Sequence, residues 1–139
     1  MEHHTSMKEY EQAIEILEEI YKRMEGVNEE FSSSIKYHIG DCYYKLERYE
    51  EAQSNLISSL SSLEKVAPKS TYLPPIYYLL GIINHKLNND QIAVDYFQKA
   101  KDYLSNVPQQ NQELQSLLSQ HLDKFANENQ QDDNFKEKK

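Results

Sequence analysis

The sequence has no tryptophan, one cysteine, three glycines and four prolines among its 139 residues. Glycine and proline are the residues that most often interrupt helices, so their scarcity predicts long, continuous helices. The single cysteine, Cys42, cannot form an internal disulfide or a CxxC motif. That usage is typical of a reducing compartment, and we expect the protein to be cytoplasmic, with Cys42 as a small core residue.

Long apolar runs and positive charge are also lacking. No stretch approaches the roughly eighteen consecutive apolar residues of a membrane span, and the N-terminus MEHHTSMKEY lacks the apolar run of a secretory signal. Lysine and arginine total 15 against 23 acidic residues, which gives a formal net charge of -8. A chain of this charge would repel a phosphate backbone. We therefore expect neither a membrane segment nor a nucleic-acid partner.

The motifs of the common catalytic sites are absent as well. The sequence contains no HExxH, no glycine-rich phosphate loop and no Gly-x-Ser-x-Gly. Adjacent glutamate pairs point to different sides of a helix and indicate a solvated face. The histidines are scattered along the chain: His3, His4, His38, His85 and His121. We accordingly expect no enzyme activity, no cofactor and no metal site.

What the sequence does contain is apolar residues at spacings of three and four, which predict amphipathic helices. We expect an all-α fold of about six helices, with Ser32 to Ser34 and Asp90 offering helix caps. Residues 1–7 are expected to form a flexible N-terminus and residues 127–139 a disordered polar tail. The expected helical domain, 8–126, comprises a half repeat at 8–26, repeats at 30–67 and 72–106, and a capping helix at 108–126.

An internal repeat organises this helical region. Gly40 and Gly81 lie 41 residues apart, and the same offset aligns Ala52 with Ala93 and Leu56 with Phe97. The first helix resembles the second half of an earlier unit. Two full repeats and a half are therefore expected.

These residues resemble the tetratricopeptide repeat, a helix-turn-helix unit with the pattern W-x2-L-G-x2-Y, then A-x3-F, then proline. The second copy departs at Asn84, where the motif has tyrosine, and the first copy has Lys36 at the aromatic position. The repeat also spans 41 residues instead of 34, a period similar to that of the extended repeats of kinesin light chain. Residues that match the motif, and that we expect to pack the repeats, are Gly40, Ala52, Gly81, Ala93, Phe97 and Ala100.

The resemblance implies stacked antiparallel helix pairs in a right-handed superhelix, whose first helices line a concave groove. It also explains Gly81, because a small residue lets the two helices of a unit approach closely. The groove would bind a peptide or helix of a partner protein, so that the chain acts as an adaptor or scaffold. The expected groove residues are Tyr37, Asp41, Tyr44, Tyr78, Ile82 and His85.

Two other interpretations concern the partner. Repeat proteins that bind the acidic C-termini of chaperones resemble one another in a clamp of lysine and asparagine side chains. This sequence has Asp41 at one of the matching positions, and Asp41 would repel a carboxylate. We therefore do not expect the chain to bind chaperone tails. The alternative function is a structural subunit that is packed permanently into a complex through its first helix or its C-terminal cap. In that case the stripe of Ile14, Leu17 and Tyr21 would be partly exposed and would dock either a partner subunit or a second copy of the chain.

Overall fold

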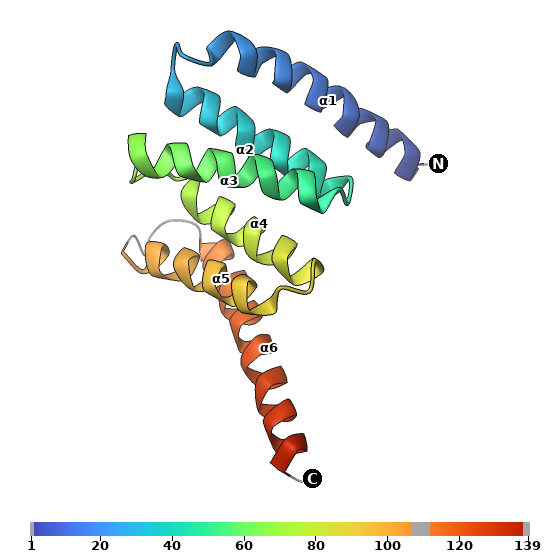
Figure 1. The fold of residues 1–139 in the computed structure, drawn as a ribbon, viewed down its shortest axis with the longest axis vertical. Coiled ribbons are helices and arrows are strands. Elements are labelled where there is room, and N and C mark those ends of the chain that lie inside the picture. The colour runs from blue at the N-terminus through green and yellow to red at the C-terminus, as the bar shows by residue number, and fades with distance from the viewer. Residues whose placement is uncertain (1, 107–111, 138–139) are drawn as a thin grey trace.

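The computed structural model describes residues 2–106 and 112–137. Within these residues the chain is all-α, as expected, and the bounds of its six helices are α1 (Glu2–Met24), α2 (Glu29–Lys45), α3 (Tyr49–Val66), α4 (Leu73–Lys86), α5 (Asp90–Ser105) and α6 (Gln112–Glu137). Figure 1 shows α1 to α5 stacked one after another along the longest axis, while α6 extends away from the far end of the stack. The pairs α2 with α3 and α4 with α5 pack most extensively.

The turns inside the two pairs have the same backbone conformation, which supports the repeat. Glu47 and Asn88 both have positive φ, at 61° and 65°. In each turn, the amide of the following residue donates to a carbonyl five residues earlier, Arg48 to Tyr43 at 2.9 Å and Asn89 to Asn84 at 2.7 Å. This left-handed residue with a bond back to the last helical turn is a common helix ending.

Close approach of the paired helices occurs at the two glycines. A Cβ atom added at Gly40 would lie 2.7 Å from Leu56 Cγ, and one added at Gly81 would lie 2.5 Å from Phe97 Cε1. Both distances are shorter than van der Waals contact allows. Ala52, on the second helix of the first pair, is fully buried. The large residue of each second helix therefore occupies the space that glycine leaves on the first helix.

In the first repeat, a long α3 is followed by a connection to α4. Helix α3 has 18 residues, and residues 67–72 join it to α4. Pro74 and Pro75 lie in the first turn of α4, where a missing backbone donor removes no helical hydrogen bond. The hydroxyl of Tyr77 then reaches back and donates to Glu64 Oε1 at 2.7 Å, which links α4 to α3.

Two helix caps differ from the prediction. The N-cap of α2 is Asn28, whose Oδ1 accepts from the Phe31 amide at 3.0 Å, and Ser32 and Ser34 donate to helix carbonyls instead. Because Asn is among the best N-cap residues, the helix starts one turn earlier than the serines suggested. Asp90 is the first residue of α5 and follows its N-cap, Asn89.

The helical region extends beyond both predicted boundaries. Helix α1 begins at Glu2, inside the segment expected to be flexible, and α6 continues to Glu137, past the expected boundary at 126. Residues 127–137, expected as a disordered tail, are part of α6 in the structure. The chain has no glycine or proline after Pro108, so no residue of the tail interrupts helical backbone. Residues 107–111, where the capping helix was expected to begin, and residues 1 and 138–139 lie outside the described residues.

The stripe on α1 that was expected to dock another subunit faces α2 instead. Ile14 is 6% exposed and belongs to a cluster with residues of α2, and Leu17 and Tyr21 are half-buried against the same cluster. The apolar side chains on the outer face of α1 are Ile16, 61% exposed, and Ile20, 37% exposed. Two apolar stripes run along this helix, and periodicity alone does not show which one meets α2.

Candidate functional site

The six expected groove residues lie on the first helices of the two repeats, three on α2 and three on α4, and all are half-buried. The structure places them around two adjoining hollows, both of which α6 completes. Tyr78 lines both hollows. The concave face is therefore formed by α2, α4 and α6 together.

The first hollow has a volume of about 390 Å³ and lies between α4 and α6, with Tyr44 of α2 at its edge. We call it the basic hollow, because its ionisable lining residues other than tyrosine are lysines and histidines. Its lining residues are Tyr44, Tyr78, Ile82, His85, Lys86, Phe97, His121, Lys124 and Phe125. The aromatic rings of Tyr78 on α4, Phe97 on α5 and Phe125 on α6 give this hollow an apolar floor.

The second hollow has a volume of about 260 Å³ and holds the other two expected residues, Tyr37 and Asp41, together with Tyr78. We call it the acidic hollow, because Asp41 and Glu113 are its charged lining residues. The remaining lining residues are Pro75, Leu79, Leu114 and Leu117. This hollow therefore combines apolar walls with two carboxylates.

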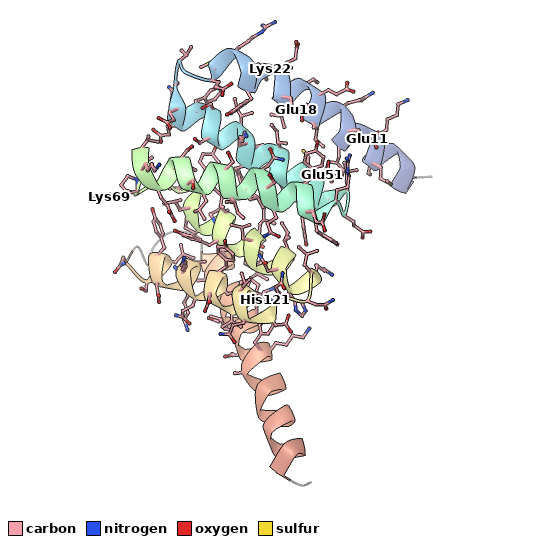
Figure 2. The ribbon with its side chains drawn as sticks, in the orientation of Figure 1. Glu11, Glu18, Lys22, Glu51, Lys69 and His121 are labelled. Carbon is pink, nitrogen blue, oxygen red and sulfur yellow. The ribbon has the colours of Figure 1, made fainter. Side chains whose placement is uncertain are left out.

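His121 attaches α6 to the repeats. Its Nε2 lies 3.0 Å from the hydroxyl of Tyr78, and its ring stacks on Phe97 with centroids 5.1 Å apart and an interplanar angle of 13°. The ring of Phe125, one turn further along α6, packs edge-to-face against the His85 ring, with the two ring centroids 5.1 Å apart. Figure 2 shows His121 where α6 passes the second repeat. These contacts fix the wall that α6 adds to the basic hollow.

Burial lowers the pKa of His121 below its ordinary value of 6.5, and the positive charges of Lys124 and His85 lower that pKa further. Because the folded-state pKa lies below the unfolded value, the unfolded chain binds this proton first as the pH falls. The neutral ring thus contributes stability that is present above about pH 6.5 and is lost as the pH falls through the folded pKa.

We therefore predict that His121→Phe, which keeps an aromatic ring but cannot titrate, flattens the pH dependence of stability. Urea unfolding of both proteins at about pH 7.5 and about pH 5.5 measures this, because these values bracket the ordinary histidine pKa. The other histidines are present in both proteins, so the difference isolates His121. Equal losses of stability in the two proteins would contradict the assignment.

Around the acidic hollow, tyrosine rings are held by their neighbours. Burial raises the pKa of Tyr37 to about 12, with further contributions from Asp41 and Tyr72. The Tyr37 ring contacts the Tyr72 ring at a centroid distance of 5.5 Å. Asp41 pairs with Lys45, one turn further along α2, at 3.2 Å. Tyr37 therefore stays neutral at physiological pH and offers an apolar ring with a hydroxyl donor.

The sequence prediction missed the contribution of α6, above all His121 and Lys124, which it assigned to a cap. A signal was available, because Leu114, Leu118, His121 and Phe125 recur at the spacing of one helix face. That face packs against α5 and, through His121, against α4.

A larger hollow lies elsewhere and is a poorer candidate. It has a volume of about 560 Å³ and lies between the end of α1, the start of α2 and the second half of α3. Its lining includes Glu25, Glu29 and four serines. Its one lysine, Lys36, lies 4.9 Å from the centroid of the Tyr21 ring. Size is its main feature, since it has neither the aromatic floor nor the gathered charge of the concave face.

The described residues contain no group of three or more His, Cys, Asp or Glu side chains placed to hold a metal ion. Over the same part of the chain, no helix has the length and apolar character needed to cross a membrane.

Comparison with known families adds to this geometry. A family model described as tetratricopeptide repeat matches residues 31–105. The chain belongs to the tetratricopeptide repeat family. The match covers α2 to α5, and tetratricopeptide repeats stack into superhelices whose concave surfaces bind other proteins. Membership therefore indicates a protein-interaction scaffold.

A curated relative extends the comparison. The chain is 31% identical over 94 residues to response regulator aspartate phosphatase I of Bacillus subtilis (strain 168). The matched segment is 67% of this tetratricopeptide repeat chain and 24% of the relative. The chain thus spans about a quarter of the length of that protein.

Proposed function

We propose that this chain binds a peptide or helix of a partner protein across the concave face formed by α2, α4 and α6. The observation that carries the proposal is that all six expected groove residues line two adjoining hollows that share Tyr78. Half-buried tyrosines suit this role, because each offers apolar area with a polar tip and loses little side-chain entropy on binding.

Several of these side chains are already fixed in place. Tyr78 is held by His121 at 3.0 Å, and the Tyr44 ring contacts the Tyr49 ring at 6.0 Å. A surface whose aromatic groups are held in position before binding avoids part of the entropy loss of association. These contacts support binding of a partner by a rigid face.

We further propose that the chain recognises its partner without catalysing a reaction, and that it acts in the cytoplasm, where a lone cysteine such as Cys42 stays reduced. The relative is named for aspartate phosphatase activity on response regulators. Because this chain matches only 24% of it, we propose that the two share a repeat scaffold for recognition and that the reaction is particular to the longer protein.

The test compares the proteins captured by the wild type and by the triple variant Tyr37→Ala, Tyr78→Ala and His85→Ala. We expect a partner that the wild type retains to bind the variant at least about tenfold more weakly, because central aromatic contacts dominate such interfaces. The helical circular dichroism signal should persist. Calorimetry with the purified partner gives the affinities.

A matched control carries three alanines on α5, at Ile92, Tyr96 and Lys99. This control should bind like the wild type, because none of its changes lines either hollow. If the groove variant also binds like the wild type, the concave face is not the interface.

The alternative function, permanent packing into a complex, is favoured by one observation, the exposure of Ile16 and Ile20 on α1. A chain of that kind would associate through α1, and Ile16→Ser with Ile20→Ser would release the partner. If a partner does not bind the variant with the two serines but still binds the groove variant, the result supports this alternative over binding in the groove.

A further inference from the structure

Charge is distributed unevenly along the concave face. Asp41 and Glu113 line the acidic hollow, whereas Lys86 and Lys124 line the basic hollow. Among the described lining residues, neither hollow contains a charged side chain of the opposite sign. Tyr78 separates the two, so the face has an acidic end and a basic end.

All three helices contribute to this separation in the same direction. On α2, Asp41 precedes Tyr44, and on α6, Glu113 precedes Lys124. On α4, Pro75 lies at the acidic end and Lys86 at the basic end. The helices therefore run the same way past the two hollows, and on α6 the charge of the lining residues changes sign along the helix.

Helix-end preferences do not account for the whole pattern. Acidic residues favour the first turn of a helix and basic residues the last turn, which explains Glu113 and Lys86. However, Asp41 lies in the C-terminal half of α2, Glu29–Lys45, and Lys124 lies in the middle of α6, Gln112–Glu137. The position of Asp41 is partly explained by its ion pair with Lys45, one turn further along α2, whereas the position of Lys124 calls for another reason.

The basic hollow also stands out against the charge of the chain. The formal net charge is -8, yet two lysines and two histidines gather around one hollow of about 390 Å³. His85 already pairs with Asp90 at 2.8 Å, so Lys86 and Lys124 supply most of the charge available to a ligand. At the other end, the Asp41 carboxylate is shared with Lys45 at 3.2 Å, and Glu113 adds a second carboxylate.

We propose that the bound partner segment carries an acidic side chain over the basic hollow, a basic side chain over the acidic hollow and an apolar or aromatic residue between them at Tyr78. This inference rests on the proposed function and specifies its ligand. Complementary charge at both ends fixes the direction in which the segment lies and disfavours partners with the reverse order.

The spacing of the two charges follows from α6. Glu113 and Lys124 are eleven residues apart on this helix, about 16 Å at the rise of an α-helix. An extended partner would span this with about five residues. A helical partner would need about eleven.

The experiment is a selection from a phage-displayed library of random twelve-residue peptides against the full chain. We expect enriched peptides to carry one acidic and one basic residue separated by about five or about eleven positions. Each selected peptide is resynthesised, and its affinity is measured with the wild type, with Lys86→Glu plus Lys124→Glu, and with the control Lys65→Glu plus Lys101→Glu. All four lysines are exposed, and none of them lines the acidic hollow. Both pairs of substitutions change the net charge by the same amount.

Reversing the charge of the two lysines in the basic hollow should weaken the binding of a peptide with an acidic residue by about tenfold or more, because attraction becomes repulsion at two positions. The control should stay within about twofold, since the reversed charges lie outside the binding face. A peptide in which the acidic residue is replaced by lysine should bind the reversed variant better than it binds the wild type.

Two outcomes overturn the inference in different ways. In the first outcome, the selected peptides lose binding to the Tyr37, Tyr78 and His85 triple variant, but they show no charge pattern or do not respond to charge reversal. This outcome contradicts the inference about charge and leaves the proposed function standing. If no selected peptide depends on those three residues, the proposed function fails as well.

Discussion

Phe97→Ala is expected to lower the free energy of unfolding by about 3 to 5 kcal/mol. Phe97 is 1% exposed, and its ring atoms lie nearest to the position that a Cβ of residue 81 would occupy. Its ring also contacts Tyr78 at 5.8 Å and His121 at 5.1 Å. One truncation therefore opens a cavity inside the second repeat and removes the surface on which α6 rests.

Urea unfolding followed by circular dichroism measures this change, and the control is Ile92→Ala on the same helix, where the side chain is 46% exposed. The control should change stability by less than about 0.5 kcal/mol. A loss for Phe97→Ala no larger than that of the control would mean that α4, α5 and α6 are not held together at this ring.

Gly81→Ala is expected to destabilise the protein by up to about 2 kcal/mol, although alanine is the better helix former. The substitution contributes about 1 kcal/mol of helix propensity, but its Cβ would lie 2.5 Å from Phe97 Cε1. Overpacking of this kind typically costs about 1 to 3 kcal/mol. The ring cannot move away easily, because His121 and Phe125 contact it.

Thermal and urea unfolding test the sign of this effect. A second variant, Gly81→Ala with Phe97→Leu, should recover part of the loss that Gly81→Ala causes in the wild-type background, because a smaller side chain leaves room for the new methyl group. If Gly81→Ala alone raises the free energy of unfolding, helix propensity outweighs contact at this position, and the close approach of the two helices does not require glycine.

The family and the all-α fold could be predicted from the sequence because the repeat leaves a periodic record. Gly40 and Gly81 recur with the large residues Leu56 and Phe97 that fill the space beside them. The turn residues Glu47 and Asn88 share a left-handed conformation at the same offset. Local residue patterns of this kind determine the pairing of adjacent helices.

The end of α6 and the outward face of α1 could not be predicted in the same way. The segment after residue 126 has a composition typical of disorder, yet α6 continues to Glu137. On α1, the stripe of Ile14 and the stripe of Ile16 are both apolar, and only contact with α2 distinguishes them. The link from His121 to Tyr78 joins residues 43 positions apart. Such a link depends on how α6 docks, which local periodicity does not encode.

Binding of a partner segment on the concave face is tested most directly by nuclear magnetic resonance. The isotope-labelled chain is titrated with the tightest peptide from the selection, and chemical-shift changes are mapped onto the structure. We expect the largest changes at the backbone amides of α2, α4 and α6 around Tyr37, Asp41, Tyr44, Tyr78, Ile82 and His85. Changes concentrated on the outer face of α1, around Ile16 and Ile20, would contradict binding in the groove and place the interface on α1.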